Sequence, residues 1–347
     1  MRVGFDCAPL THPHSRGVAR VCAALLAALE RRAVLEVVRL TPTRGTELRT
    51  WRARELPTRA ARERLHGLHA FTSGYAWRGP GKRVATVHEL PWRHGVQENA
   101  DWRHRLWATL GVARADRVVV PSAHVAADLA RSPLVSRSKV RVVPWGVEAC
   151  FAPESPPGEV DERVLARYRL GEEPFVFAPG ATRAKKNLPA LLHGLAERRR
   201  LGLEPLRLVV SGAETPALRT ALGLASKLGL ARWITTLDEV AEEDLPALYR
   251  LARAVPVLSL SEGFGLPVLE ALASGTPPLV PPASAQAEVA GAAGLVLADC
   301  TPASVAQGLE RALRERAQLR ARGLARAREL GWDAAAARVE ALWSELA

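Results

Sequence analysis

Two glutamates in one short segment are the residues of this chain best suited to ligand chemistry. The segment SEGFGLPVLEALASGTPPLV, residues 261–280, places Glu262 and Glu270 eight positions apart, with two glycines and a proline between them. An apolar run typical of a buried strand precedes Glu262, and a helical run with Pro267 in its first turn follows it. The pattern predicts that Glu262 lies in a strand-to-helix loop and that Glu270 lies one turn inside the helix.

The helix N-terminus expected between these two carboxylates is suited to binding an anion. Its free backbone N–H groups and the positive end of its dipole attract negative charge, and Gly263 and Gly265 let a ligand approach the backbone closely. A phosphate placed there would have a carboxylate on either side, each able to accept hydrogen bonds from neighbouring hydroxyls. A diphosphate with diols on both sides is a nucleotide sugar. The alternative is a capping glutamate beside a solvated one, and spacing alone does not decide between the two.

The elements that must position these residues repeat as strand, loop and helix along the chain. Strand-like runs lie within residues 1–10, 81–90, 113–120, 139–148, 172–179, 205–214, 231–240, 253–260 and 277–284. Because parallel strands need crossover connections, this alternation predicts an α/β fold with two parallel, helix-covered sheets. Ligands of such sheets bind beyond the carboxyl ends of the strands.

The domain organisation expected from these runs has four parts. Its parts are an N-terminal domain over 1–155, a Pro/Gly/Glu-rich linker over 156–172, a C-terminal domain over 173–330 and a terminal amphipathic helix over 331–347. Trp332 and Trp343 are the expected apolar anchors of that helix.

Composition narrows the class of protein. A length of 347 residues exceeds the usual size of a single core and favours two domains. The chain has no apolar run long enough to span a membrane and no opening typical of a secretory leader, so we expect a cytoplasmic protein. Its cysteines are far apart without a CxxC pair, which argues against a cysteine zinc site or a disulfide framework; they are Cys7, Cys22, Cys150 and Cys300.

The charge of the chain is uneven. Residues 1–150 hold 25 Lys and Arg against 12 Asp and Glu, a net charge of +13, and residues 151–347 hold 23 against 24. Tryptophans share the basic part with arginines, at Trp51, Trp77, Trp92, Trp102, Trp107 and Trp145. The combination favours contact with an anionic membrane surface, here the inner membrane face, or an anionic lipid-linked acceptor. The alternative is core tryptophans beneath a solvated arginine surface; a nucleic-acid partner is not expected, because no nucleic-acid-binding fold is recognisable.

The segment that begins at Glu262 resembles the EGFGLPxxEAMAxGxPVV signature of retaining glycosyltransferases of family 4. PGATRAKKNLPALL resembles that family's G-x6-K-N segment, with Gly180, Lys186 and Asn187 in matching places. The opening strand and loop match at Gly17, TVHEL resembles the family's TVHDL, and VVPWGVE resembles its VVPNGVD. The resemblance implies the GT-B fold of two facing Rossmann-like domains, a nucleotide-sugar donor, no cofactor and no required metal ion.

The resemblance also implies roles for single residues. Glu262, His88 and Lys186 are the expected catalytic residues, acting respectively on the transferred sugar, on the donor sugar and on the diphosphate. The expected donor-binding residues are Glu270, Gly17, Arg183, Gly263, Phe264, Gly265 and Leu266. Glu270 would hold the ribose, and Arg183 would replace a phosphate-binding arginine at the position of Ala181.

The implied reaction is transfer of a hexose to the hydroxyl of a glycan or lipid-linked acceptor with retention of configuration. Mannose is the candidate sugar, and GDP-mannose is favoured over UDP sugars. If retention required a nucleophilic carboxylate, Glu262 would be that nucleophile. The resemblance implies instead that the acceptor attacks from the same face as the leaving diphosphate, which helps to take the acceptor proton. A sugar-nucleotide epimerase and a nucleotide-sugar-binding protein without turnover are the alternatives.

Overall fold

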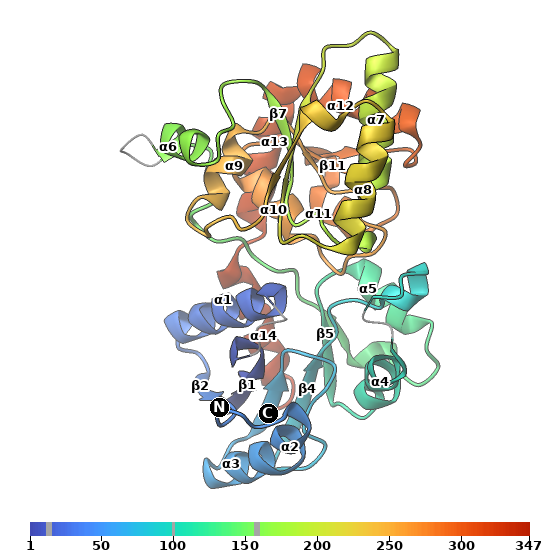
Figure 1. Ribbon diagram of the computed structural model, residues 1–347. Helices are drawn as coiled ribbons and strands as arrows, with labels where there is room; N and C mark the ends of the chain where they lie inside the picture. Colours follow the sequence, from blue (N-terminus) through green and yellow to red (C-terminus); the bar gives the residue numbers. More distant parts are fainter. Residues whose placement is uncertain (12–15, 99–100, 156–159) are drawn as a thin grey trace. The chain divides into compact units, whose positions relative to one another are not determined.

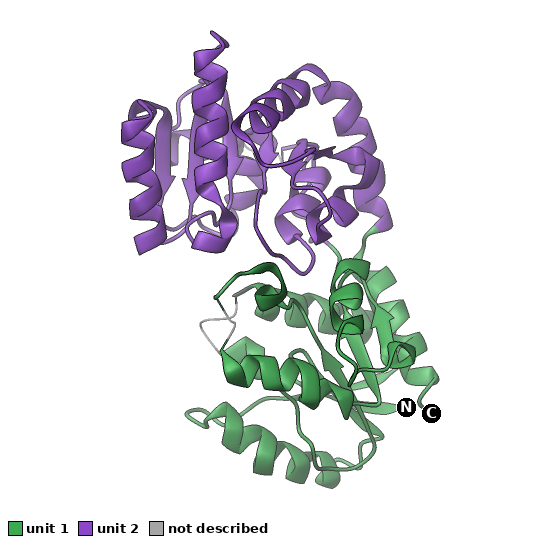
Figure 2. Ribbon diagram, turned by 90° about the vertical axis from the view of Figure 1, so that its right-hand side faces the viewer, with its two compact units in different colours: residues 1–146, 330–347 green, residues 147–329 purple. Residues whose placement is uncertain are grey.

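The computed structural model describes residues 1–11, 16–98, 101–155 and 160–347. The chain forms two compact units, shown in Figure 2: unit 1 comprises residues 1–146 and 330–347, and unit 2 comprises residues 147–329. Both are built on parallel strands connected by helices, which confirms the predicted α/β class.

Six strands form one parallel sheet in the described part of unit 1, in the order β2-β1-β3-β4-β5-β6 (Figure 1). Their bounds are β1 (Arg2–Asp6), β2 (Glu36–Leu40), β3 (Gly67–Ala70), β4 (Lys82–Thr86), β5 (Arg117–Val120) and β6 (Val140–Val142). The helices are α1 (Arg16–Arg32), α2 (Leu48–Thr50), α3 (Leu56–Arg62), α4 (Trp102–Leu106), α5 (Ala123–Ala130) and α14 (Trp332–Ser344). Continuous apolar runs such as Val118 to Val120 are buried, as strands covered on both faces require.

Two three-stranded parallel sheets form the frame of the described part of unit 2, in the orders β7-β8-β9 and β10-β11-β12. The strands are β7 (Phe175–Ala178), β8 (Arg207–Ser211), β9 (Ile234–Leu237), β10 (Val255–Pro256), β11 (Pro278–Val280) and β12 (Leu295–Val296). A parallel bridge between Val176 and Ala254 joins the two sheets. Unit 2 therefore has one continuous parallel frame with β7 and β10 at its centre.

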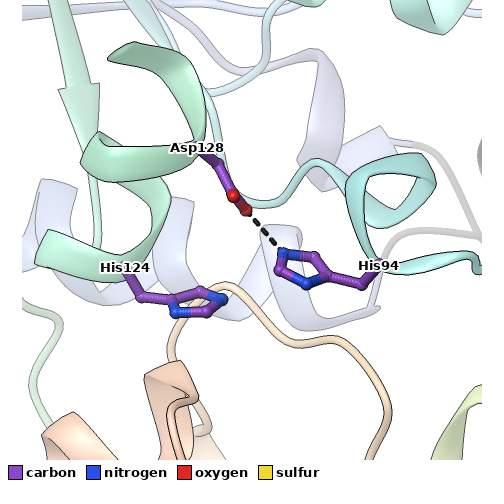
Figure 3. Close-up of side chains that lie close together, drawn as sticks. All are labelled: His94, His124 and Asp128. Atoms are coloured by element: carbon purple, nitrogen blue, oxygen red, sulfur yellow. Dashed lines mark hydrogen bonds and ion pairs between the residues drawn. The ribbon is translucent and has the colours of Figure 1, made fainter. Parts of the chain in front are cut away.

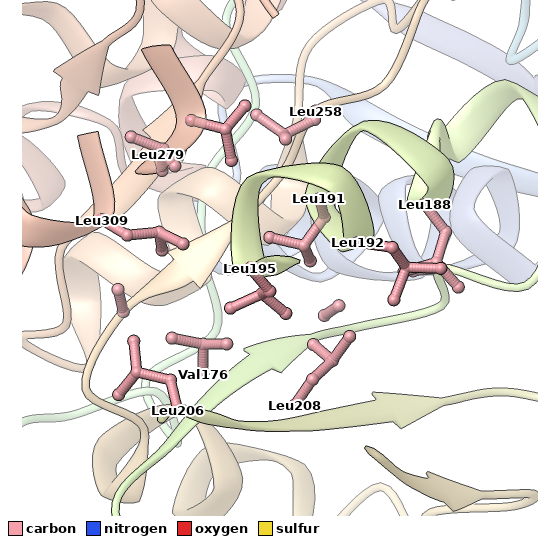
Figure 4. Close-up of a cluster of buried hydrophobic side chains, with 14 of the residues drawn as sticks. Val176, Leu188, Leu191, Leu192, Leu195, Leu206, Leu208, Leu258, Leu279 and Leu309 are labelled. Atoms are coloured by element: carbon pink, nitrogen blue, oxygen red, sulfur yellow. The ribbon is translucent and has the colours of Figure 1, made fainter. Parts of the chain in front are cut away.

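The helices of unit 2 cover this frame. They are α6 (Val160–Arg167), α7 (Leu188–Arg200), α8 (Pro216–Lys227), α9 (Leu245–Leu251), α10 (Leu266–Ala273), α11 (Ala285–Ala290), α12 (Pro302–Arg314) and α13 (Arg316–Glu329). Figure 4 shows the leucines of α7 directed at the strands, with Leu192 and Leu195 near Val176 and Leu208. This buried cluster fixes α7, and with it the loop that leads from β7 into α7.

The terminal helix expected over 331–347 is α14, and it belongs to unit 1. Trp343 is fully buried, and a Cβ added to Gly67 of β3 would lie 2.5 Å from its ring. Trp332 is buried as well and stacks on Trp145, with 6.5 Å between ring centroids. Both expected anchors therefore pack inside unit 1. Of the expected linker, residues 156–159 lie outside the described residues, and α6 occupies much of the remainder.

Within the described residues, no helix is both long and apolar enough to cross a membrane.

Candidate active site

The loops that follow the central strands of unit 2 contact one another at the carboxyl ends of those strands. Gly180 follows β7, and its N–H donates to the Ser211 hydroxyl at the end of β8, at 3.3 Å. The backbone N–H of Leu260 donates to the carbonyl of Lys185 at 2.8 Å, which ties the loop after β7 to the segment after β10. Gly180 has a positive φ of 59°, a conformation that glycine adopts at little cost. The loops thus meet where an α/β sheet places its ligands.

Glu262 lies between two lysines in this region. Its Oε1 atom is 2.6 Å from the Nζ atom of Lys186, and its Oε2 atom is 3.8 Å from the Nζ atom of Lys185. The side chain of Lys185 is 3% exposed and that of Glu262 is 14% exposed. The structure therefore brings together the two expected catalytic residues of unit 2, Glu262 and Lys186, and adds Lys185, which the sequence analysis did not assign to the site.

The electrostatics of this trio favour an anionic ligand. Burial by itself would raise the pKa of the Glu262 carboxyl, but the charges of Lys186 and Lys185 outweigh burial and lower that pKa to about 2. Glu262 is therefore ionised at neutral pH. Two ammonium groups and one carboxylate leave one net positive charge.

The N-terminus of α10 adds to this positive potential. Gly265 is its N-cap, with a φ of 102°, and no side chain caps the first turn. A Cβ at Gly265 would lie 3.3 Å from Cγ of Gln286, a fully buried residue on α11. The predicted loop position of Glu262 and first-turn position of Pro267 are confirmed. The uncapped backbone N–H groups can bind an anion, as the sequence predicts.

Glu270 lies on the same helix but in the interior. It is 2% exposed, and its Oε2 atom accepts a hydrogen bond from the hydroxyl of Tyr249, which is itself fully buried. The ring of Tyr249 is held edge-on by Phe151 and Phe177, with centroid distances of 5.5 and 5.3 Å. Tyr249 thus fixes the orientation of Glu270, and the ribose role of Glu270 stays a prediction.

The other expected donor-binding residues of unit 2 occupy the same two loops. Gly263 and Phe264 are buried between Glu262 and the start of α10, and Leu266 is half-buried at the first position of that helix. Arg183 is exposed and precedes the short 3-10 helix η6 (Ala184–Lys186). Its place in the loop is compatible with a phosphate contact, which stays a prediction.

His88 lies in unit 1, two residues after the end of β4. Its Nε2 atom is 2.8 Å from the carbonyl oxygen of Phe71. Because a carbonyl only accepts hydrogen bonds, Nε2 is the protonated nitrogen and Nδ1 is an acceptor. Burial lowers the pKa of His88 more than the bond to Phe71 raises it, so the ring is neutral at pH 7.

Gly17 also lies in unit 1, in the first turn of α1. Its φ is outside the left-handed region, and a Cβ added there would meet no described atom within 4 Å. The structure itself therefore gives no steric reason for glycine at this position. Its expected role, close approach of the loop to a ligand, stays a prediction, and residues 12–15 of that loop lie outside the described residues.

Three site residues were missed by the sequence analysis: Lys185, Tyr249 and Gln286. The adjacent lysines in residues 185–186 were visible, but a turn of two lysines does not reveal that both reach one carboxylate. Tyr249 and Gln286 meet the site only through contacts made by the fold, and no sequence signal marks them.

Two family models match the chain. The model for "Glycosyl transferases group 1" matches residues 163–329, and the model for "Glycosyltransferase Family 4" matches residues 22–149. The first lies in unit 2 and includes the Glu262 site, and the second lies almost entirely in unit 1 and includes His88.

Among curated proteins, the O-antigen chain mannosyltransferase B of Escherichia coli is 34% identical over 178 residues, covering 49% of this chain and 45% of that protein. The D-inositol 3-phosphate glycosyltransferase of Nocardia farcinica is 34% identical over 223 residues, covering 61% and 48% respectively. The MMP alpha-(1->4)-mannosyltransferase of Mycolicibacterium hassiacum is 32% identical over 181 residues, covering 52% and 40%. The chain spans about half the length of the curated relatives it matches.

Solved structures match along the whole chain. A sucrose-phosphate synthase from Thermosynechococcus elongatus has a TM-score of 0.79 at 19% identity, covering 100% of this chain and 99% of its own. Anabaena HepE in complex with UDP and glucose has a TM-score of 0.76 at 16% identity, with both chains fully covered at 100%. At these identities the likeness shows the fold. With one glycosyltransferase model matching each unit and the Glu262 signature in place, the chain belongs to the family 4 glycosyltransferases of the GT-B fold.

Proposed function

We propose that the protein transfers a hexose from a nucleoside-diphosphate sugar to an acceptor hydroxyl. The observation that carries the proposal is Glu262, held ionised by Lys186 and Lys185 three residues before the uncapped N-terminus of α10. The family to which the chain belongs supports the same reaction.

In this proposal the positive groups act on the leaving diphosphate. Negative charge grows on the diphosphate as the glycosidic bond breaks, and ammonium groups and backbone N–H groups fixed in advance stabilise that charge without reorganisation. Lys186 and the start of α10 supply them, and Lys185 keeps Glu262 ionised beside them. No cation is needed for this part, so transfer is expected to survive EDTA.

Glu262 is assigned to positioning the sugar and stabilising an oxocarbenium-like state, as opposed to forming a covalent bond. A carboxylate whose pKa is lowered to about 2 by two lysines is a weak nucleophile and a weak base. Same-face attack, with the departing diphosphate helping to take the acceptor proton, is the form of retention that we propose. Neutral His88 contributes a hydrogen-bond acceptor, Nδ1, for a hydroxyl of the donor sugar.

Mannose carried by GDP is the donor we propose. The matches to two mannosyltransferases support it. UDP sugars are the competing donors, because UDP is named in the HepE structure. Thermal-shift measurements with GDP, UDP and ADP separate the bases, since a ligand at a hundred times its dissociation constant adds about 2.7 kcal/mol of apparent stability.

Release of nucleoside diphosphate tests the reaction class. We expect release from the donor to depend on a glycan or lipid-linked acceptor and to give a product with retained configuration. Interconversion of the donor without acceptor would identify an epimerase, and donor binding without turnover on any acceptor would identify a binding protein. Either result would contradict the proposal.

We further propose that unit 1 rests on an anionic membrane surface, where a lipid-linked acceptor would be found. Trp51 and Trp145 cannot contribute to this, which corrects the expectation for two of the six tryptophans. Both are buried, and the indole N–H of Trp51 donates to Asp6 at 2.8 Å. An indole whose N–H has a buried carboxylate partner is part of the core.

The support for membrane contact is a surface stripe on α4 and the following π-helix η4 (Trp107–Gly111). Trp102, Leu106 and Leu110 recur every four residues and are 68%, 42% and 46% exposed. Arg103 and Arg105 flank the stripe and are exposed. Apolar side chains beside basic ones fit the headgroup boundary of an anionic leaflet.

Co-sedimentation with anionic vesicles tests this contact. We expect binding at low salt, loss of most binding at about 0.5 M salt, and weaker binding for Trp102→Ser. Leu134→Ser is the control, because Leu134 is 50% exposed in unit 1 but outside the stripe. Equal binding of neutral vesicles, or no effect of Trp102→Ser, would contradict the proposal.

A further inference from the structure

Three potential metal ligands converge in unit 1, and none of the three has been given a role above. His94 ends the 3-10 helix η3 (Pro91–His94) after β4, and His124 and Asp128 lie on α5 after β5. Figure 3 shows the two histidine rings and the carboxylate directed at one another. One ligand atom from each residue lies within 4.8 Å of the other two. Among the described residues, these three form the group of potential metal ligands, drawn from His, Cys, Asp and Glu, whose ligand atoms all lie this close together.

The sequence spacing and the fold together create this arrangement. His124 and Asp128 are four residues apart on a helix, so their side chains share one face. His94 approaches that face from η3, with its Nε2 atom 2.6 Å from Oδ2 of Asp128. The rings of His94 and His124 stack with 5.0 Å between centroids. Both elements follow the carboxyl ends of their strands, the edge at which such sheets bind ligands.

The distances suit a small ion. A tetrahedral ion holds nitrogen and oxygen ligands at about 2.0–2.1 Å, which places the ligand atoms about 3.4 Å from one another. The spacing here starts at 2.6 Å, for His94 and Asp128, and does not exceed 4.8 Å. Shifts of the ligand atoms by roughly 1 Å, of the size that side-chain rotations produce, would therefore bring all three atoms to coordination distance.

The ligand types select the ion. Two imidazoles and one carboxylate suit Zn²⁺ and neighbouring transition metals, whereas Mg²⁺ and Ca²⁺ prefer all-oxygen sites. The side chain of Asp128 is 8% exposed, and a buried carboxylate is stabilised by a bound cation. The side chain of His94 is 25% exposed, which leaves a route for the ion and for a water ligand.

We propose that His94, His124 and Asp128 bind a divalent transition-metal ion of the Zn²⁺ type, with water completing the coordination. The ion joins η3 to α5 and so holds the segment that follows β4 against the segment that follows β5. We assign the ion no part in sugar transfer, and the inference does not rest on the proposed function.

Zinc titration in competition with a chromophoric chelator tests the site. The parent protein for this test has no tag and carries Cys150→Ser, because Cys150 is an exposed thiol that can bind metal by itself. We expect about one ion per chain with a dissociation constant on the order of 1 μM or tighter. His124→Ala and Asp128→Asn should each weaken binding by at least about 100-fold, since losing even a residue that only orients a ligand costs about 10–100-fold. His193→Ala is the matched control, because His193 is exposed on α7 of unit 2; it should leave binding unchanged.

Co²⁺ substitution tests the coordination of the ion without any site variant. The proposal therefore stays testable even if a site variant fails to fold. The Co²⁺ protein should show the visible absorption of a four-coordinate nitrogen and oxygen site, and Zn²⁺ should displace it. EDTA should lower the melting temperature of the zinc-loaded protein while the initial rate of sugar transfer holds. No zinc binding by the parent protein, or binding equal to it in both site variants, overturns the proposal.

Discussion

The two units carry charge in different ways. Unit 1 has 26 Lys and Arg against 14 Asp and Glu, a net charge of +12, whereas unit 2 has 22 of each and is neutral. Many cations of unit 1 have local partners: Arg52 meets Asp6 at 3.2 Å, and Arg39 meets Glu30 at 2.6 Å. In neutral unit 2, Lys185 and Lys186 converge on Glu262, whose side chain is 14% exposed. Arginines of unit 1 also converge on one carboxylate, that of Glu345, but its side chain is 42% exposed.

This contrast separates long-range attraction from chemistry. A unit with a large net charge draws anionic partners from a distance, and salt screens that attraction. A few cations fixed at the ends of strands act only on the group that reaches them, but they act strongly because they are partly shielded from water. Mutations at the Glu262 and Lys186 pair of unit 2 should therefore change turnover, while mutations and conditions that act on the charged surface of unit 1 should change binding and stability.

The largest effect is expected for Lys186→Ala. Loss of this ammonium should lower kcat/KM by about 10²–10³, the range seen when one fixed charge-stabilising donor is removed from an active site. Lys227→Ala is the control, because Lys227 is exposed at the end of α8 in the same unit. Steady-state kinetics of nucleotide release measures both. Equal activity of the two variants would show that net charge, and not placement, matters in unit 2.

Tyr249→Phe should have the next largest effect. It removes the hydroxyl that orients Glu270 and keeps the packing of the ring between Phe151 and Phe177. We expect nucleotide affinity to fall about tenfold, or about 1.4 kcal/mol, with little change in kcat. Calorimetric titration with the nucleoside diphosphate measures the affinity. A fall in kcat with unchanged affinity would move Glu270 from the ribose to the reacting sugar.

Mild acid should weaken unit 1 before unit 2. His69 is buried in unit 1, and burial lowers its pKa to about 3. Below the unfolded pKa of about 6.5, the unfolded chain binds a proton that the folded chain does not, so stability falls with pH at up to about 1.4 kcal/mol per pH unit. In unit 2 the pKa of Glu262 is instead lowered, to about 2. The stability that ionised Glu262 adds to the fold is therefore complete above a pH of about 4.5, the usual pKa of a glutamate, and is lost only as the pH falls from there toward about 2.

Hydrogen exchange at pH 7.5 and 5.5 can resolve these two responses. After correction for the intrinsic exchange rates, peptides of β3 and β4 should lose about 1 kcal/mol of protection at the lower pH, and peptides of β7 and β8 should not. Greater loss in unit 2 would reverse the predicted order.

The smallest effect on stability is expected for Gly17→Ala. The position is helical and exposed, with open space where a Cβ would lie. The free energy of unfolding should therefore change by no more than about 0.5 kcal/mol, which the melting temperature measures. If donor KM rises while stability holds, the space is needed by a ligand. Unchanged kinetics would remove Gly17 from the site.

The contacts that were predictable from sequence are those within one short segment. The Gly-rich turn before α10 and the position of Pro267 both depend on neighbouring residues. Residue types at these positions predict the local backbone geometry directly. The buried strands with continuous apolar runs, such as β5 and β8, were predictable for the same reason.

The contacts that sequence reasoning missed join distant segments. β3 has the sequence GLHA and little strand signal, because Gly67 makes room for Trp343 near the end of the chain. Lys185 and Glu262 are likewise far apart in the chain, and only the meeting of two loops reveals their contact. The buried state of Trp51 depends on Asp6, and the cluster at His94 depends on α5. Such pairs depend on how distant segments are brought together by the fold, and a short stretch of sequence carries no information about that.

Glu262→Gln is the sharpest test of the proposed role of Glu262, because it removes the charge between the two lysines and preserves the size of the side chain. With Glu242→Gln as an exposed control in unit 2, kcat and the dissociation constant of the nucleoside diphosphate are measured on the same preparations. We expect kcat to fall by at least about 100-fold while the dissociation constant changes by less than about threefold, since Glu262 acts on the reacting sugar and not on the nucleotide. A variant that keeps its kcat, or that loses nucleotide binding in proportion to turnover, would show that Glu262 does not act on the reacting sugar in this way.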